Sequence, residues 1–432
     1  MKESGIDWIG KIPEEWIVRP IKHIVETPVT DGPHETPVLY EAGIPFLSAE
    51  AVKDGVLDFN FKRGYISLKD HDRFKKKISP KKDDIFIVKS GATTGNVGIV
   101  NTDEIFDIWS PLALIRCNKT LAIQKYIYFY LLSTLFKSQV EFNWSFGTQQ
   151  NIGMGVIERI KVILPPVSEQ QKIVEVLDKK TAQLDKAKAL LEEQIQKLKD
   201  YRTSLIYETV TKGLDKTVPM KDSGIDWIGQ VPEGWGVKPL KYLIEFKNGY
   251  AFDSQNLTIE QTGVKVIRIG DFKSSGIDFN AALNVFTSLN SKLDFYRIRK
   301  SQILIAMSGA TVGKISFVNQ EPNVYSVINQ RVGIIESKIS KWIYYCLSTD
   351  SFMSYIQLNS NGSAQPNISS GEISDFKVAI PNDVVIQKCV KYLDNQLESI
   401  NKLIQIKNQQ IENINKQRQT LIYDYVTGKR RV

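Results

Sequence analysis

The sequence predicts an α+β protein in which two pseudo-symmetric mixed α/β domains are separated by a pair of long antiparallel coiled-coil helices. Three observations predict this fold. The nonapeptide at residues 2–10 recurs almost letter for letter at residues 221–229. Each copy ends in a stretch with an aliphatic side chain every seven residues, and matching short apolar runs flank a glycine-rich loop in each copy. Such self-similarity indicates a repeated structural unit.

The two copies stay in register along most of the chain. Ser90-Gly-Ala-Thr-Thr-Gly95 corresponds to Ser308-Gly-Ala-Thr-Val-Gly313, and Leu205-Ile-Tyr207 corresponds to Leu421-Ile-Tyr423. We therefore expect four segments. They are a first domain at residues 1–165, a central long helix at 166–212, a second domain at 213–380 and a C-terminal long helix at 381–432.

Within each domain, short apolar runs before and after the Gly-Ala-Thr loop predict a strand, a loop and a strand. The runs are Ile85–Val88 and Val97–Val100 in the first copy and Ile303–Ile305 and Ile315–Val318 in the second. Helices are expected at residues 122–140 and 338–357. A polar loop then follows in each copy, at residues 147–151 and 362–367.

The first long helix is expected to run from Ser168 to Val210, with Ser168 as N-cap and Gln171 completing a capping box. Heptad spacing predicts a spacer coiled coil with a second helix, from Asp383 to Val426. The predicted seam residues are Val174, Leu177, Leu184, Leu191, Ile195, Leu198 and Leu205 in the first helix, and Val390, Leu393, Leu397, Ile400, Ile404, Ile411, Ile414 and Leu421 in the second.

Two other arrangements would also hide these apolar stripes. Each helix could pack on its own domain, or a second chain could supply the partner helix. We expect the two helices to pair with each other, because their lengths match and a long apolar stripe is costly to leave exposed.

Composition bounds the class of protein. At 432 residues the chain exceeds the roughly 250–300 residues at which single cores stop growing. Its longest apolar stretch is far shorter than a membrane span, and its first residues lack a signal-peptide core, so we expect a cytoplasmic protein. Three scattered cysteines and three histidines spell out neither a disulfide framework nor a metal site, and we expect the cysteines to fill apolar cores.

The sequence contains no recognisable catalytic motif. The sequence Gly309-Ala-Thr-Val-Gly-Lys314 resembles a phosphate-binding loop, but it is one residue short and Ile315 stands where Ser or Thr would hold magnesium. Glu336-Ser-Lys338 is half of a nuclease-like pair with no partner carboxylate upstream. We read Glu336 as the solvated end of a strand.

The remaining features suit binding. Basic side chains precede the Gly-Ala-Thr loop in both copies, and such residues neutralise phosphates and fix orientation without reading sequence. They are Arg73, Lys75, Lys76, Lys77, Lys81 and Lys82 in the first copy and Arg297, Arg299 and Lys300 in the second. A plain solvated loop is the alternative, since the net charge of +8 is spread along the chain.

Polar loop residues are the other candidates, because amides, hydroxyls and nearby backbone groups can reach a phosphate or a base edge. They can equally close their own loops. In the first copy the candidates are His34, Thr36, Lys89, Ser90, Thr93, Thr94, Gln149, Gln150 and Asn151. In the second they are Lys247, Asn248, Tyr250, Ser308, Thr311, Lys314, Gln365 and Asn367.

The chain resembles the specificity subunit of a type I restriction-modification system over essentially its whole length. The resemblance is carried by Pro165-Pro-Val-Ser-Glu-Gln-Gln-Lys-Ile173, by the Gly-Ile-Asp-Trp-Ile-Gly segment with its following Pro-Glu-x-Trp, and by the twofold order of variable domain and long helix. The second helix entrance, residues 380–388, departs from the pattern because it lacks the Glu-Gln pair.

The resemblance implies two target-recognition domains, each reading half of an interrupted site in double-stranded DNA. It implies that the long helices act as a spacer and dock two methyltransferase subunits, with restriction and motor subunits joining the full complex. S-adenosylmethionine is expected in those methyltransferase partners, so this chain binds no cofactor and catalyses nothing. The competing hypothesis is a coiled-coil scaffold whose duplicated domains bind protein.

Overall fold

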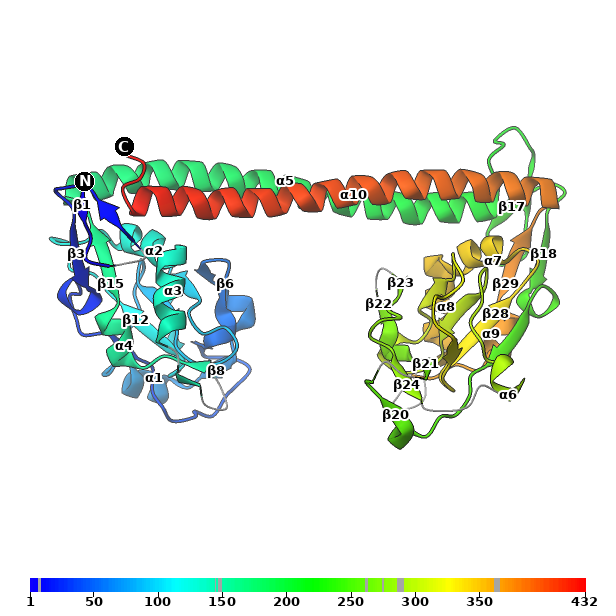
Figure 1. Ribbon diagram of the computed structural model, residues 1–432, viewed down its shortest axis with the longest axis horizontal. Helices are drawn as coiled ribbons and strands as arrows, with labels where there is room; N and C mark the ends of the chain where they lie inside the picture. Colours follow the sequence, from blue (N-terminus) through cyan, green and yellow to red (C-terminus); the bar gives the residue numbers. More distant parts are fainter. Residues whose placement is uncertain are drawn as a thin grey trace. The chain divides into compact units, whose positions relative to one another are not determined.

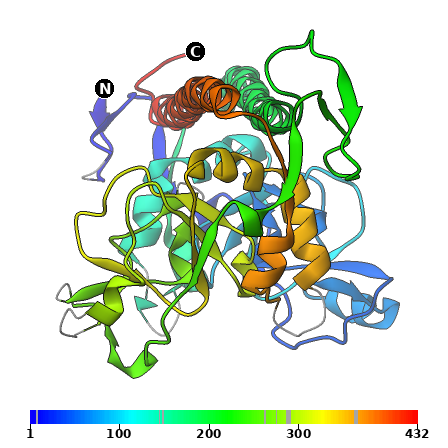
Figure 2. The ribbon, with the colours of Figure 1, turned by 90° about the vertical axis from the view of Figure 1, so that its right-hand side faces the viewer.

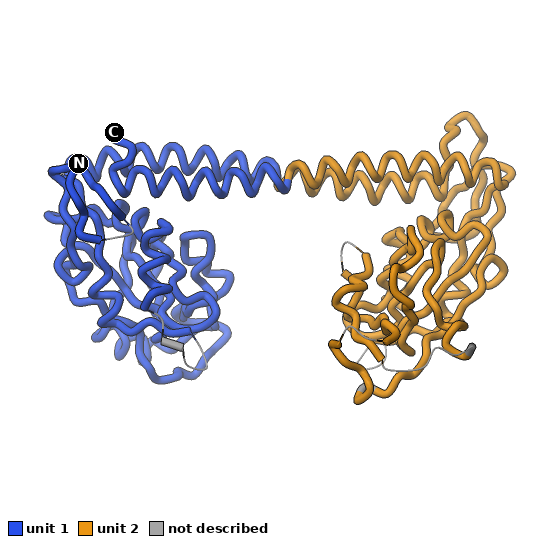
Figure 3. Tube along the Cα trace, in the orientation of Figure 1, with its two compact units in different colours: residues 1–191, 408–432 blue, residues 192–407 orange. Residues whose placement is uncertain are grey.

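The computed structural model describes residues 1–6, 9–143, 145–146, 150–260, 263–273, 276–285, 291–360 and 366–432. It divides into two compact units (Figure 3). Unit 1 contains residues 1–191 and 408–432, and unit 2 contains residues 192–407. Each unit joins one globular domain to one portion of α5 (Val167–Lys212) and one portion of α10 (Asp383–Val426).

The core of unit 1 is a mixed sheet with strand order β4-β12-β9-β10-β7-β6. Its central strands β9 (Ile85–Val88) and β12 (Leu112–Ile115) are buried along their whole length, as expected for β-branched and aliphatic runs. The outer strands are β4 (Thr30–Asp31), β10 (Val97–Ile99), β7 (Val56–Leu57) and β6 (Val52–Lys53). A smaller sheet of β11 (Asp107–Ile108), β5 (Ile44–Leu47) and β8 (Gly64–Ile66) carries α1 (Leu68–Phe74) through the Phe46, Ile66 and Phe74 side chains.

Unit 2 repeats this plan with a smaller central sheet and a larger second sheet. Its central sheet has the order β19-β28-β25-β26, and a second sheet has the order β20-β24-β21-β27. The first comprises Glu245–Asn248, Val332–Glu336, Ile303–Ala306 and Ile315–Phe317. The second comprises Leu257–Thr258, Leu283–Val285, Val264–Ile267 and Ser326–Ile328.

Helices and two-stranded antiparallel pairs complete both units. In unit 1 they are α2 (Gln124–Leu132), α3 (Thr134–Phe142), α4 (Met154–Arg159), β15 (Lys161–Leu164) paired with β3 (Ile17–Pro20), and β1 (Lys2–Glu3) paired with β2 (Lys11–Ile12). In unit 2 they are α6 (Ser291–Asp294), α7 (Ser340–Leu347), α8 (Asp350–Ser360), α9 (Ser370–Asp375), β29 (Lys377–Ile380) paired with β18 (Gly236–Pro239), β16 (Met220–Asp222) paired with β17 (Gln230–Pro232), and β22 (Phe272–Lys273) paired with β23 (Gly276–Ile277).

The four strands predicted beside the Gly-Ala-Thr loops are confirmed as two antiparallel pairs, β9 with β10 and β25 with β26. The helix predicted at residues 122–140 is instead two helices. The break falls at Ser133, whose backbone is extended and whose hydroxyl donates to the Tyr130 carbonyl at 2.5 Å. The helix predicted at 338–357 is likewise split, at Ser348 and Thr349. Short hydroxyl side chains offer the backbone local hydrogen bonds that compete with a continuous helix.

All the predicted seam residues are buried or half-buried. Within unit 1, Val174 and Leu177 of α5 share a core with Ile422 and Val426 of α10. Within unit 2, Leu198 and Leu205 of α5 share a core with α10 residues that include Leu393 and Ile400. The two helices run side by side within each unit (Figures 1 and 2). Their pairing agrees with the predicted fold class, and each helix also packs on the domain of its own unit.

The predicted start of the first long helix is wrong. The helix begins at Val167, so Ser168 lies in its first turn and the Gln171 side chain donates to Glu175 at 3.2 Å instead of closing a capping box. Proline explains the earlier start, because its fixed φ is preorganised for a first turn and the amides of Glu169 and Gln170 bond to the Pro166 carbonyl at 2.9 and 3.0 Å.

Candidate nucleic-acid interface

The two polar loops predicted from the sequence meet in each unit. In unit 1, Ser90 forms an antiparallel bridge with Asn151, and the Gly91 amide donates to the Gln150 carbonyl at 3.1 Å. In unit 2, Ser308 forms the same bridge with Asn367, and the Gly309 amide donates to the Pro366 carbonyl at 2.9 Å. Each Gly-Ala-Thr loop is therefore held against the loop that precedes α4 or α9. Gln149 and Gln365 lie outside the described residues.

A third loop joins these two at the same end of each central sheet. In unit 1 it follows β4, and in unit 2 it follows β19. Asp31 pairs with Ala113, and Asn248 pairs with Gly333, so Gly32 and Gly249 begin equivalent loops. We call the three loops of each unit its loop edge. It comprises residues 32–36, 90–96 and 150–151 in unit 1, and 249–252, 308–314 and 366–367 in unit 2.

The glycine at the start of this third loop is required in both units, because neighbouring backbone atoms leave no room for a side chain. A Cβ on Gly32 would lie 2.3 Å from the carbonyl oxygen of Ile108, and a Cβ on Gly249 would lie 2.0 Å from that of Asn329. No side chain fits at such distances from backbone atoms. The equivalent close approach confirms that the two units share this part of the backbone.

Three of the candidate residues of unit 1 converge on Asp31, which the sequence analysis did not single out. Lys77 and Lys89 form ion pairs with the Asp31 carboxylate, and His34 Nε2 lies 3.0 Å from Asp31 Oδ2. Lys77 also donates to the Gly32 carbonyl at 2.8 Å. Burial opposes ionisation of Asp31, but the hydrogen bonds from Lys77 and Lys89 outweigh it and lower the pKa of this carboxyl.

The basic cluster around α1 is largely balanced by carboxylates. Arg73 pairs with Asp70 at 2.7 Å and Glu35 at 3.2 Å, and Lys82 pairs with Asp103 at 3.0 Å. Lys75 pairs with Asp72. Lys76 and Lys81 are exposed. In Figure 1, α1 lies at the end of unit 1 remote from α5 and α10.

The basic residues of unit 2 are arranged in the same way. Arg299 pairs with Asp294 at 2.7 Å, and Arg297 pairs with Glu321 at 3.3 Å while its guanidinium lies 4.8 Å from the centre of the Tyr325 ring. Lys300 and Lys314 are exposed. Lysines with exposed ammonium groups are the better candidates for phosphate contacts, because internal ion pairs already neutralise the others.

The hydroxyl candidates divide between loop closure and exposure. Thr94 Oγ1 donates to the Gly91 carbonyl at 2.7 Å, and Thr311 Oγ1 donates to the Ile269 carbonyl at 3.3 Å. Ser308 is buried and accepts a hydrogen bond from Arg331 at 3.1 Å. Thr36 and Thr93 are exposed. The exposed pair remains available to a ligand, whereas the others hold the loops together.

Unit 2 also gathers aromatic side chains that the sequence analysis largely missed. The Tyr250 ring lies 4.8 Å from Phe252 and 5.3 Å from Tyr296, and Lys247 lies 5.4 Å from the ring centre of Phe295. Lys247 itself pairs with Glu336 at 2.7 Å, so Glu336 is an ion-pair partner and the reading of it as a solvated strand end is incomplete. Adjacent aromatic residues in the loops were the available sequence signal. Exposed aromatic rings can stack on nucleobases.

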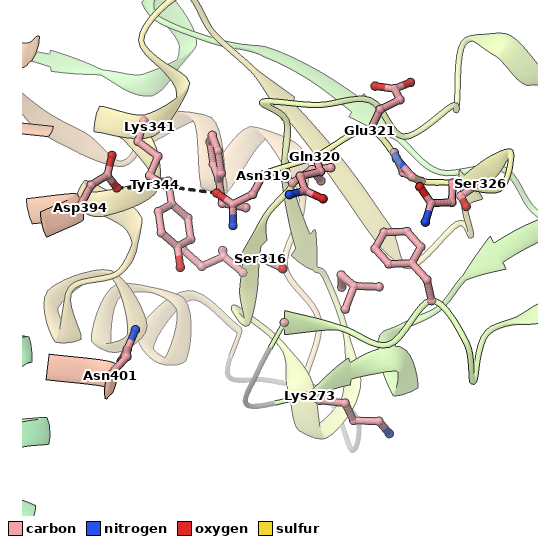
Figure 4. A pocket seen from close by; sticks show the side chains of 18 of the residues that line it. Lys273, Ser316, Asn319, Gln320, Glu321, Ser326, Lys341, Tyr344, Asp394 and Asn401 are labelled. Atoms are coloured by element: carbon pink, nitrogen blue, oxygen red, sulfur yellow. Dashed lines mark hydrogen bonds and ion pairs between the residues drawn. The ribbon is translucent and has the colours of Figure 1, made fainter. Parts of the chain in front are cut away.

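A polar cleft of about 1200 Å³ lies elsewhere in unit 2, between α7, α10 and the strands β22, β23 and β26 (Figure 4). Lys341 Nζ lies 3.3 Å from both Asn319 Oδ1 and Asp394 Oδ1, and Tyr345 donates to the same Asp394. These contacts tie α7 to α10. They form no catalytic grouping, and no set of described residues could hold a metal ion.

The cysteines behave as predicted. Cys117, Cys346 and Cys389 are free and buried. Burial raises the pKa of Cys117 to about 12 and that of Cys389 to about 11, so neither is a thiolate near neutral pH. Across the described residues, no helix is long and apolar enough to cross a membrane.

A family model for the type I restriction modification DNA specificity domain matches residues 13–199 and 232–413. The chain belongs to this family. Its relatives are named specificity subunits of type I restriction enzymes. It is a type I specificity subunit, and DNA target recognition is consistent with its duplicated domains.

Three comparisons place the chain within the family. It is 24% identical over 439 residues to the type I restriction enzyme MjaVIII specificity subunit of Methanocaldococcus jannaschii, covering 98% of this chain and 94% of the relative. It is 27% identical over 436 residues to the putative MjaX specificity subunit of the same organism, covering 98% and 96%. A solved structure from work on complex assembly and conformational transition of the type I R-M system matches with a TM-score of 0.70 at 13% identity, covering 96% of this chain and 98% of the other, which shows the fold alone.

Proposed function

We propose that this specificity subunit reads an interrupted site in double-stranded DNA, one half with the loop edge of unit 1 and the other with the loop edge of unit 2. One observation carries the proposal. The same three loops are built on the same strand register in both units but with different side chains. Equivalent frames with different contents can read two different half-sites.

The chemistry of the loop edge suits this task. Gln150 and Asn151 carry amide groups, and a side-chain amide can pair with adenine in the major groove. Exposed hydroxyls at Thr36 and Thr93 can bond to base edges or phosphates. Exposed lysines nearby can contact phosphates, which fixes the orientation of the domain without reading sequence.

We further propose that the paired portions of α5 and α10 act as a spacer between half-sites and dock two adenine-methyltransferase subunits. Binding of one half-site then raises the effective concentration of the second reader, so two weak interactions become one specific interaction. In the full complex, restriction and motor subunits join these partners in the cytoplasm. S-adenosylmethionine belongs to the methyltransferase subunits, and this chain reads DNA without catalysing a reaction.

The first test measures salt dependence. The chain, purified with its methyltransferase partners, should bind its selected DNA less tightly as salt rises, because phosphate contacts release counterions. Lys76→Gln, at an exposed lysine next to Lys77, and Lys314→Gln should each reduce the slope of log K against log salt by about one. Lys119→Gln is the matched control, because Lys119 is exposed beyond the opposite end of β12 from the loop edge. A salt-independent affinity would favour the protein-binding scaffold instead.

The second test changes the spacer. Lys407 Nζ lies 2.5 Å from Gln194 Oε1, and Arg418 Nε lies 3.3 Å from Asp185 Oδ1. By this register, residues 185–191 face 411–417, all within unit 1. Deleting both segments removes seven residues from each helix, or about 10 Å at ~1.5 Å per residue.

That shortening equals about three base pairs at ~3.4 Å each. Selection from DNA with a randomised gap should return a gap shorter by about three base pairs, or no specific site at all. Deleting residues 185–191 alone is the control, because it leaves the two helices unequal in length, shifts their pairing by one heptad on one side of the deletion, and should abolish specific binding. An unchanged gap preference after the double deletion would refute the spacer.

A further inference from the structure

Asp31 links two of the three loops of the unit 1 loop edge, namely the loop after β4 and the Gly-Ala-Thr loop. Its side chain is 9% exposed, and it lies at the end of β4, immediately before Gly32. Lys89, at the end of β9, is 13% exposed and pairs with Asp31 Oδ2. Lys77, just beyond α1, reaches Asp31 Oδ1 at 2.7 Å and the Gly32 carbonyl at 2.8 Å. One carboxylate thus links the third loop, the Gly-Ala-Thr loop and the segment after α1.

The remaining loop is attached to the same point through the backbone. The Ile152 amide donates to the Lys89 carbonyl at 2.8 Å, and Asn151 bridges to Ser90. Lys89 therefore connects the loop before α4 to the Asp31 carboxylate.

Unit 2 keeps this backbone and changes the side chains. The Ile368 amide donates to the Met307 carbonyl at 2.9 Å, as Ile152 does to Lys89, and Met307 precedes the bridging Ser308 as Lys89 precedes Ser90. Asn248 holds the strand position of Asp31. The charged pair Asp31 and Lys89 of unit 1 is therefore replaced by Asn248 and Met307. Both residues of the pair differ between the two units, so neither unit carries one charged residue without its partner at these two positions.

We propose that Asp31 is a positioning residue of unit 1: paired with Lys89, it sets the conformation of the loop edge that reads one half-site, and Asn248 with Met307 is the uncharged equivalent in unit 2. This inference rests on the proposed function. Lys77 and Lys89 then hold the loops rather than contact phosphates, because their charges are already shared with Asp31.

The chemistry predicts a specific pattern of defects. Removing one partner of a nearly buried ion pair leaves the other charge uncompensated, whereas replacing both partners by uncharged groups is often tolerated. Asp31→Asn should therefore harm unit 1 more than the double variant Asp31→Asn with Lys89→Met. In unit 2, Met307 is buried and Asn248 is exposed, so Met307→Lys alone should be worse than Met307→Lys with Asn248→Asp, which supplies the missing carboxylate.

The experiment uses the full chain with its methyltransferase partners and selects binding sites from randomised DNA. Asp31→Asn should weaken binding about tenfold and reduce base preference in one half-site only. Met307→Lys should do the same in the other half-site, because Met307 is buried. Each double variant should regain most of the lost affinity and base preference. A purely structural defect without a paired origin would not be rescued by removing a second side chain.

Asp103→Asn is the control matched for charge. It removes an exposed carboxylate that pairs with Lys82, and it should leave both half-site preferences unchanged. If Asp31→Asn prevents folding, the unit 2 variants decide the question alone. The proposal fails if each single variant keeps the affinity and base preference of the parent chain, or if neither double variant improves on its single variant.

Failure of the proposed function would look different. In that case the parent chain would select no DNA site. Thermal unfolding of the parent chain, Asp31→Asn, Lys89→Met and the double variant would then still measure the coupling of Asp31 to Lys89. The absence of coupling would overturn the pair itself.

Discussion

Unit 1 and unit 2 share their strand register but not the polar pairs attached to it. In unit 1, Arg116 donates twice to Asp84, at 2.8 and 2.6 Å. At the equivalent positions of unit 2, Gln302 donates to Glu336 at 2.5 Å. The Lys81 backbone amide donates to Asp84 Oδ2, and the Arg299 backbone amide donates to Gln302 Oε1, each at 2.7 Å. The backbone is therefore the same in both units. Buried apolar strands therefore maintain the frame, while polar partners change in pairs.

In contrast to these polar pairs, the ion pair that joins the globular domain to a long helix is the same in both units. Lys125 pairs with Asp178 of α5 at 2.7 Å in unit 1, and Lys341 pairs with Asp394 of α10 at 3.3 Å in unit 2. The side chains that differ lie at the strand ends and loops, whereas those that match lie against the helices. This division is the one expected if the helices are a common frame and the loops carry specificity.

The largest expected effect tests the shared backbone. Gly32→Ala and Gly249→Ala should each destabilise their own unit by about 4 kcal/mol, because the new methyl group would collide with a backbone carbonyl in both units. Chemical denaturation followed by fluorescence would measure the loss. Gly270→Ala is the control, since its new methyl group would meet no neighbouring atom within 4 Å. A harmless substitution at either Gly32 or Gly249 would break the claimed equivalence.

The next effect tests the exchanged pair. Asp84→Gln should lower the free energy of unfolding of unit 1 by about 3 kcal/mol, because it leaves the largely buried Arg116 guanidinium without its carboxylate. Adding Arg116→Glu rebuilds the unit 2 pairing and should cost less than the sum of the two single changes. A double-mutant cycle by denaturant unfolding measures this coupling. Strict additivity would contradict the idea that these positions change as a pair.

A third effect depends on pH and distinguishes Asp31 from Asn248. Because the pKa of Asp31 is lowered in the folded protein, the ionised carboxylate stabilises the fold above its ordinary pKa of 3.8, and this contribution is lost as the pH falls through the lowered value. The stability difference between the parent chain and Asp31→Asn should therefore be constant near neutral pH and shrink below about pH 4. Unfolding curves at stepped pH would show it. Asn248→Ala should give a difference without this acid dependence.

The smallest effect concerns the matching helix contacts. Lys125→Met should cost about 0.5 kcal/mol, because both members of its ion pair are substantially exposed. Lys341→Met should cost about 1 kcal/mol, since Lys341 is less exposed and also lies 4.4 Å from the ring centre of Phe317. Thermal unfolding would rank the two. A larger loss at Lys125 than at Lys341 would contradict this comparison.

Much of the frame was predictable because local patterns encode it. The strands beside both Gly-Ala-Thr loops and the end points of α10 follow from apolar runs and heptad spacing. The split at Ser133 and the start of α5 at Val167 were missed, because hydroxyl side chains and prolines act through local backbone geometry that periodicity does not report. Among candidate residues, the bridges from Ser90 to Asn151 and from Ser308 to Asn367 join loops that the sequence had marked separately.

By itself, the sequence determined the duplication, the two long amphipathic helices and the absence of a recognisable catalytic motif, since each of these is written in residue order and spacing. Only the tertiary structure decided which charges are already paired. Asp31 is 46 and 58 residues away from Lys77 and Lys89 in the chain, and nothing in the spacing links them. Ion pairing depends on distance in space, which strand register sets, so the division of lysines into loop holders and phosphate contacts could not be made before the fold was known.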